Sequence, residues 1–112
     1  MAKKDLGKTS IGMQPELAAL LSYLFGFITG LIFYVIEKKN KYVRFHAMQS
    51  MLAFGALFVI AIILPFIPVI GLIMVPFLWL AQVILWIIMM IKAYQGEMLK
   101  LPVVGDMAEK NS

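Results

Sequence analysis

Four polar residues open the second long apolar stretch of the sequence, and their types and spacing are the first candidates for chemistry. Arg44 is followed by His46, Gln49 and Ser50. Positions 46, 49 and 50 are spaced i, i+3 and i+4, so these side chains share one face of a helix. In a membrane such a face turns toward a bundle interior or a water-filled cavity. Two interpretations follow: hydrogen bonds to neighbouring helices, with Arg44 reaching the lipid phosphates, or a transport or catalytic role.

Gln82 and Thr29 are further polar residues within the apolar stretches. Gln82 is about ten residues from the end of its stretch, which corresponds to the bilayer centre at about 1.5 Å per residue. We expect its amide to pack over small residues of the first stretch, since Gly26 lies at a similar depth. Thr29 and Gln49 share a shallower level, where they could bond each other.

The first stretch contains small residues at every fourth position. These are Ser22, Gly26 and Gly30, and the last two form a G-x-x-x-G motif. Small residues on one helix face let a second backbone approach closely in lipid. The motif fits packing within the chain, and it also fits a homodimer seam.

The residue types needed for most catalytic and metal sites are missing. The sequence has no cysteine and one histidine, whereas a zinc site uses three or four Cys, His or carboxylate ligands. No paired carboxylates, and no nucleophile with a base, occur in the apolar stretches. We therefore expect no catalytic residue, no metal and no cofactor, and we expect that the protein is not an enzyme.

Composition indicates that lipid surrounds the elements carrying these residues. Of 112 residues, 62% are hydrophobic and 14% are charged, too few charges to cover a soluble domain. Residues 17–36 carry no charge and span about 30 Å as a helix, the thickness of a hydrocarbon core. Residues 45–91 also carry no charge, but as one helix they would measure about 70 Å, so they must fold back.

Pro65, Pro68 and Gly71 mark the fold-back, because proline removes backbone donors and glycine permits a turn. The sequence thus predicts an all-α, membrane-embedded bundle of three transmembrane helices, at about 17–36, 45–64 and 72–91. We expect a mobile N-terminal segment over 1–14, a transmembrane domain over 15–96, and an interfacial C-terminal tail over 97–112.

Basic residues predict the orientation. Three crossings place the termini on opposite sides, with the first loop and the tail together. That side holds seven basic residues, against three at the N-terminus: Lys38, Lys39, Lys41, Arg44, Lys92, Lys100 and Lys110 against Lys3, Lys4 and Lys8. The positive-inside rule then predicts a cell-membrane protein with its N-terminus outside and its C-terminus in the cytoplasm. Because the lysines flank apolar segments, we expect the lipid bilayer as partner and no nucleic acid.

Three segments carry a family resemblance: Leu31–Ser50 with its run Arg-Phe-His-Ala-x-Gln-Ser, Ala93–Glu97, and Leu101–Asp106. They resemble a widespread prokaryotic family of small membrane proteins of unknown function, over roughly residues 15 to 110. That family is similar to the twenty-kilodalton component of the chloroplast inner-envelope protein-import translocon, which is described with four spans where this chain has room for three. The resemblance implies that Arg44, His46, Gln49 and Ser50 matter, but not what they do.

Two functions are compatible with these features. We expect a non-enzymatic membrane component that self-associates or joins a membrane complex. The alternative is a subunit of a channel or protein-translocation pathway. One chain cannot line a pore, because the outer halves of the second and third stretches are almost wholly apolar. An oligomer could, using Ser22, Thr29 and Gln82.

Overall fold

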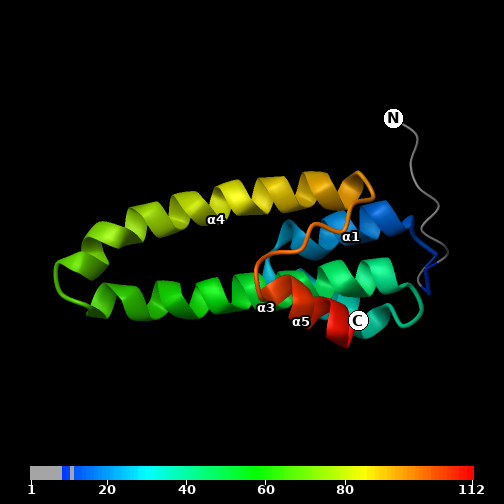
Figure 1. Ribbon diagram of the computed structural model, residues 1–112, viewed down its shortest axis with the longest axis horizontal. Helices are drawn as coiled ribbons and strands as arrows, with labels where there is room; N and C mark the ends of the chain where they lie inside the picture. The colour runs from blue at the N-terminus through cyan, green and yellow to red at the C-terminus, as the bar shows by residue number, and fades with distance from the viewer. Residues whose placement is uncertain (1–8, 11) are drawn as a thin grey trace.

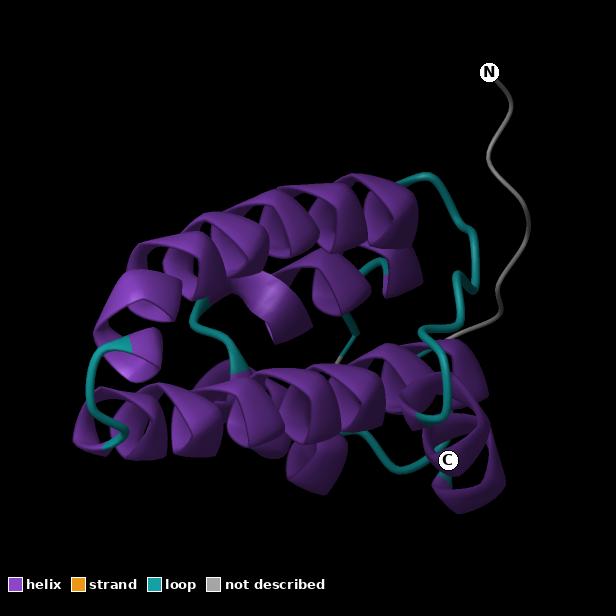
Figure 2. Ribbon diagram, turned by 60° about the vertical axis from the view of Figure 1, so that its left-hand side comes forward, coloured by secondary structure: helices purple, strands orange, loops and turns teal. Residues whose placement is uncertain are grey.

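The chain folds into helices joined by short turns, as the computed structural model in Figure 1 shows for residues 9–10 and 12–112. The helices are α1 (Pro15–Leu24), α2 (Phe27–Ile36), α3 (Lys41–Ile63), the 3-10 helix η1 (Leu64–Phe66), α4 (Ile70–Tyr94) and α5 (Val104–Asn111). Figure 2 likewise shows helices and loops, and no strand, in the described part. The all-α prediction is confirmed. The mobility predicted for residues 1–14 stays a prediction, since residues 1–8 and 11 of that segment lie outside the described residues.

In the part of the chain that the structure describes, two helices are long and apolar enough to cross a membrane: α3 continued by η1, and α4. The 25 residues of α4 extend about 38 Å, more than the hydrocarbon core requires. The turn between them is where the prolines predict it, since Pro65 lies in η1 and Pro68 follows it. Gly71 permits the close return, because any side chain there would collide with the Leu64 carbonyl. The stretches expected at 45–64 and 72–91 thus belong to two long antiparallel helices.

The first apolar stretch does not form the single crossing helix expected over 17–36. It is divided into α1 and α2, of ten residues each, with Gly26 between them at φ +61°. The chain doubles back there: the Ser10 amide, before α1, donates to the Glu37 carboxylate, after α2, at 2.7 Å. Each arm is about 15 Å long, half the hydrocarbon core. We call α1 and α2 together the re-entrant hairpin.

The re-entrant hairpin changes the relation between the chain ends. Ser10, the loop after α2 and the start of α3 all lie at one end of the molecule, and the C-terminus is at that same end (Figure 1). The turn between α3 and α4 is at the opposite end in both views. The expectation that three crossings separate the two ends therefore does not hold for the residues from Ser10 onward, while Lys3, Lys4 and Lys8 lie outside the described residues.

The core is concentrated at the end that holds the re-entrant hairpin. Its largest fully covered side chains come from α1, the first half of α3, the last turns of α4 and the loop after α2: Tyr23, Glu37, Val43, Phe45, His46, Gln49 and Met89. Toward the α3–α4 turn, large apolar side chains are exposed instead, as suits contact with lipid. The sequence-predicted polar face therefore lies inside the one well-packed half of the molecule.

Candidate functional site

The polar face of α3 is set by the cap at the start of that helix. The Asn40 side chain accepts a hydrogen bond from the Val43 amide at 3.1 Å, so the helix begins there and not a turn later. His46 and Gln49 then lie between one and three turns into α3, facing α1 and the linker over residues 95–103. Tyr23 of α1 reaches this face because α1 ends at the same depth.

Tyr23, His46 and Gln49 form a continuous chain of hydrogen bonds. The Gln49 Nε2 group donates to the Tyr23 hydroxyl at 3.0 Å, and that hydroxyl lies 2.8 Å from His46 Nδ1. His46 Nε2 lies 2.8 Å from the carbonyl oxygen of Glu97. A carbonyl can only accept, so Nε2 carries the proton, and Nδ1 accepts from Tyr23 when the ring is neutral. The hydrogen-bond directions are thereby fixed along the chain.

The amide of Gln49 also holds the linker backbone. Its Nε2 donates to the Leu99 carbonyl at 2.8 Å, and its Oε1 accepts from the Leu101 amide at 2.9 Å. Together with its bond to Tyr23, Gln49 uses both amide N–H groups and its amide oxygen. It thereby satisfies backbone groups of the linker that no secondary structure pairs. The linker is fixed on α3 by a side chain that sequence reasoning placed on the polar face.

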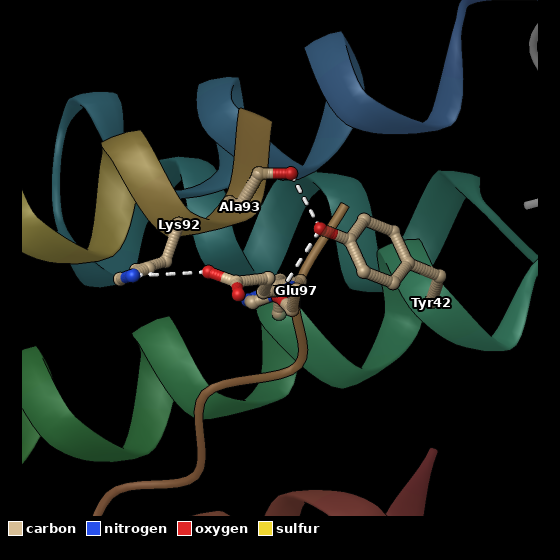
Figure 3. Close-up of polar contacts among 5 residues, drawn as sticks. Tyr42, Lys92, Ala93 and Glu97 are labelled. Carbon is tan, nitrogen blue, oxygen red and sulfur yellow. Dashed lines mark hydrogen bonds and ion pairs between the residues drawn. The ribbon is translucent and has the colours of Figure 1, made fainter. Parts of the chain in front are cut away.

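A second hydroxyl fixes the point where α4 ends. The Tyr42 hydroxyl donates to the carbonyls of Ala93 and Glu97, and Glu97 also pairs with Lys92 at 3.1 Å (Figure 3). Carbonyls at a helix C-terminus lack partners within the helix; the Ala93 carbonyl accepts from the Gly96 amide at 3.3 Å, and Tyr42 adds a second donor there. The sequence analysis did not single out Tyr42; its place four residues before His46, hence on the same helix face, was the available signal.

Arg44 lies in the same turn as His46 but on another face, and its partners are protein groups. Its Nη1 donates to the carbonyls of Tyr34 at 3.0 Å and Glu37 at 2.9 Å, and its Nε donates to the Ser112 carbonyl at 3.0 Å. The guanidinium carbon lies 4.1 Å from the centre of the Tyr34 ring. A cation at the C-terminal end of α2 also complements the helix dipole. One interpretation of the sequence placed the Arg44 guanidinium at the lipid phosphates. In the structure it instead bonds and packs against other parts of the chain.

Glu37 organises the loop between α2 and α3, although sequence reasoning treated it only as part of a polar turn. Its carboxylate accepts hydrogen bonds from the amides of Ser10, Lys39 and Asn40 at 2.7 to 2.9 Å, and from the Ser10 hydroxyl at 2.8 Å. Burial raises the pKa of this carboxyl, but the hydrogen bonds outweigh burial and lower the pKa to about 2. Glu37 thus joins the start and the end of the re-entrant hairpin.

The break in the hairpin exposes backbone groups that lipid cannot satisfy, and Thr29 satisfies two of them. Its hydroxyl accepts from the Phe25 amide at 3.1 Å and donates to the Ser22 carbonyl at 3.1 Å. Thr29 and Gln49, expected as a possible pair, therefore bond different groups. The Ser22 hydroxyl itself donates to the Ala18 carbonyl at 2.9 Å.

Carbonyls at the break also accept hydrogen bonds from side chains of the two long helices. Trp86 Nε1 donates to the Tyr23 carbonyl at 2.7 Å, and the Ser50 hydroxyl donates to the Gly26 carbonyl at 2.9 Å. A broken helix persists at membrane depth only where such partners exist. Trp86 and Ser50 therefore stabilise the bend on its two sides.

The small residues predicted to share one helix face have separate roles. Gly30 of α2 packs directly on α3: a Cβ there would lie 2.8 Å from the Ala47 carbonyl oxygen. Gly26 supplies the left-handed backbone of the bend, and Ser22 lies before the bend on α1. The structure thus places Gly30 in packing within the chain, while the break means that Gly26 and Gly30 do not form the face of a continuous helix.

Gln82 lies apart from this cluster, on α4. It borders a groove of about 170 Å³ with Phe54, Trp79, Val83 and Trp86, and its Nε2 atom is buried without a hydrogen-bond partner. Phe54 lies between this region and the bend, since a Cβ on Gly26 would be 3.5 Å from the Phe54 Cβ. The prediction that the Gln82 amide packs over the small residues is therefore wrong, because the Phe54 side chain lies against Gly26 instead.

These contacts define what the site can do chemically. The cluster of Tyr23, His46 and Gln49 bonds backbone and itself, so it offers no free acid or base in this arrangement. Among residues 9–10 and 12–112, no group of three or more His, Asp or Glu side chains could hold a metal ion. A larger groove of about 450 Å³ between α1 and α4 is mainly apolar: Leu20, Trp86, Ile87, Met90, Ile91, Tyr94 and Gln95 line it. The arrangement is one that holds helices and a linker together.

Comparison with known proteins shows which family the chain resembles. Residues 9–108 match a family described as the magnetosome magnetite crystal formation protein family. The chain is 52% identical over 107 residues to a UPF0132 membrane protein of Methanocaldococcus jannaschii, covering 96% of each chain. It is 47% identical over 98 residues to a UPF0132 membrane protein of Archaeoglobus fulgidus, covering 88% of this chain and 95% of the relative. No solved structure matches. These relatives support a small prokaryotic membrane family; the similarity to the chloroplast translocon component stays a prediction.

Proposed function

We propose a function on the premise that this chain belongs to the magnetosome magnetite crystal formation protein family, whose relatives named above are membrane proteins. The proposed function is that of a non-enzymatic membrane component that self-associates or joins a membrane complex. The proposal takes its membrane character from the names of these relatives, and it takes nothing from the family's description.

The observation that supports this proposal is that the polar cluster makes its hydrogen bonds within the chain. His46, Gln49 and Tyr23 bond one another and the linker backbone. A catalytic or transport site needs groups that can meet a substrate or exchange a proton, within hydrogen-bond reach of it. A bonded cluster instead gives a defined shape to the half of the molecule that holds the re-entrant hairpin. Such a shape is what an assembling component presents to its partner.

We also propose a cell-membrane location with the charged end of the molecule in the cytoplasm. The loop after α2 and the residues after α4 lie at that end, and so does Ser10. The basic residues of this end favour the cytoplasm by the positive-inside rule. We therefore keep the predicted cytoplasmic C-terminus. The start of α1, which was predicted to lie outside, is proposed to lie on the cytoplasmic side as well.

A subunit of a channel or translocation pathway is the second candidate, and the broken first stretch favours it. Half-length helices with a bend at membrane depth occur where backbone lines a cavity or a substrate site. The resemblance to the translocon component suggests the same class. Purified protein in liposomes should then pass ions or small solutes, and a Thr29→Val variant, which removes the hydroxyl at the bend, should change the flux.

Association in the membrane tests the main proposal. Two copies with different tags would be co-expressed, extracted in a mild detergent and captured through one tag. Recovery of the second tag is the expected result, and copies mixed only after extraction serve as the control. Single-molecule subunit counting in native membranes checks stoichiometry. A single copy per particle, with no other protein retained at stoichiometric amount, would contradict the assembly proposal.

A further inference from the structure

The groove beside Gln82 begins where the re-entrant hairpin ends. On the cytoplasmic side, α1 packs against both long helices, and Trp86 contacts the end of α1. Beyond that level the hairpin is absent, and the space next to Phe54 is the open groove of about 170 Å³. Trp79 on its rim is 52% exposed. The hairpin therefore fills the gap between α3 and α4 over only part of their length.

Gln82 leaves an unpaired donor in this groove. Its Nε2 is covered but has no partner among the described residues. An unsatisfied buried polar group destabilises the fold, and lipid tails offer it no acceptor. Gln82 is half-buried and lines the open groove, so a change of its rotamer would bring the amide to the open side of the groove. The amide therefore needs an acceptor from outside the chain.

The sequence indicates where that acceptor comes from. Between residues 51 and 91, Gln82 is the one side chain with an amide, a hydroxyl or a charge. A second copy related by a two-fold axis along the membrane normal brings its own Gln82 to the same depth. A glutamine amide has two donors and one acceptor oxygen, so two of them can bond reciprocally. A second copy thus satisfies both amides with one contact.

The residues around Gln82 fit a helix-to-helix contact of this kind. Trp79, Gln82, Val83 and Trp86 follow the i, i+3, i+4, i+7 spacing of one helix stripe, and the groove they line is open to a partner. The indole of Trp79 adds exposed apolar area at a position that an adjacent helix 8–10 Å away would cover.

We propose that this stripe of α4 is a two-fold interface between two copies of the chain, closed by hydrogen bonds between the two Gln82 amides. The inference rests on the proposed self-association and adds its location and its polar contact. It makes Gln82 the partner-binding residue of the membrane-embedded surface, separate from the internal cluster around His46.

Cysteine crosslinking tests the location of this interface, and the absence of native cysteines makes single-cysteine variants unambiguous. Trp79→Cys and Val83→Cys, which both leave the Gln82 amide in place, would be treated in native membranes with a short homobifunctional maleimide. Ile84→Cys is the matched control, because Ile84 is exposed but does not line the groove. Strong dimer bands at 79 and 83 and a weak band at 84 are expected. Equal crosslinking at all three positions, or a maximum at 84, would overturn the proposed interface.

Substitution of the amide tests the polar contact. Gln82→Leu keeps the volume and removes the hydrogen bonds, whereas Ile84→Leu leaves the amide intact. Interhelical hydrogen bonds in membranes contribute about 0.6–2 kcal/mol, so we expect Gln82→Leu to weaken dimerisation in liposomes by about 3- to 30-fold, measured by energy transfer at varied protein-to-lipid ratios. Unchanged dimerisation would refute the role of Gln82 while leaving self-association intact; a wild-type chain that remains monomeric at every ratio would refute both.

Discussion

Substitution of Gly30 by alanine tests whether α2 lies against α3 as described. In the structure a Cβ at position 30 would lie 2.8 Å from the Ala47 carbonyl oxygen, 3.0 Å from the Met51 amide nitrogen and 3.1 Å from the Ser50 Cβ. Two of these three atoms belong to the backbone, which cannot move aside without displacing the helix. Gly30→Ala should therefore push the two helices apart.

Gly55 provides the matched control on the same pair of helices. A Cβ at position 55 would approach only the Phe27 Cβ, at 3.8 Å, which is ordinary van der Waals contact. Both glycines lie within helices, so alanine gains about 1 kcal/mol of helix propensity at each position. Overpacking a close contact costs about 1–3 kcal/mol. The propensity gain cancels in the difference between the variants, so Gly30→Ala should be less stable than Gly55→Ala by about 2 kcal/mol, roughly 30-fold in the folding equilibrium.

The assay is reversible unfolding in mixed micelles of a mild detergent with increasing fraction of a denaturing detergent, followed by helical circular dichroism. Each variant is compared with the wild-type chain under the same micelle composition. If α2 were turned about its axis or separated from α3, position 30 would lie on a lipid-facing side. In that case both alanines would stabilise the protein equally. Equal stability of Gly30→Ala and Gly55→Ala would thus refute the close packing of α2 on α3.

The remaining predictions concern topology, the linker and acid stability. Single cysteines at Gln14 and Lys38 should react from the same side of the membrane with an impermeant thiol reagent, and a cysteine at Phe66 from the other side; opposite sides for the first two would contradict the hairpin. Gln49→Leu, which leaves the linker groups of Leu99 and Leu101 unpaired, should destabilise the fold by about 2 kcal/mol and raise amide exchange over 97–101, whereas unchanged exchange would contradict its role. The Glu37 carboxylate has a folded pKa of about 2, below its ordinary 4.5, so its contribution is complete above about pH 4.5 and is lost as pH falls toward 2. Glu37→Gln should remove about 2 kcal/mol of stability at neutral pH after solvent screening and flatten the acid dependence of unfolding; an unchanged pH profile would contradict this.

The long helices were predictable because one physical constraint determines them. An uncharged run of 47 residues is too long for a single crossing, and prolines near its middle mark the turn. The shared face of His46 and Gln49 was also predictable, since helical spacing alone brings them together. Their partners were not, because linker carbonyls such as that of Leu99 carry no signal in residue type. The contacts of Arg44 with α2 were hidden for the same reason, as they are to backbone carbonyls.

The bend at Gly26 shows why the first stretch was misjudged. Its length and apolar composition fit one crossing of the hydrocarbon core, and they fit two half-length arms equally well, because both keep twenty apolar residues in lipid. What separates the two folds is the supply of partners for the backbone at the bend, and these come from distant positions, namely Ser50 and Trp86. A serine in the first half of α3 and a tryptophan well inside α4 look like ordinary packing residues when each helix is considered alone. Their role is visible only when a broken helix ends between them, because their side chains then add hydrogen bonds to the carbonyls of Gly26 and Tyr23 beside those that the local backbone makes.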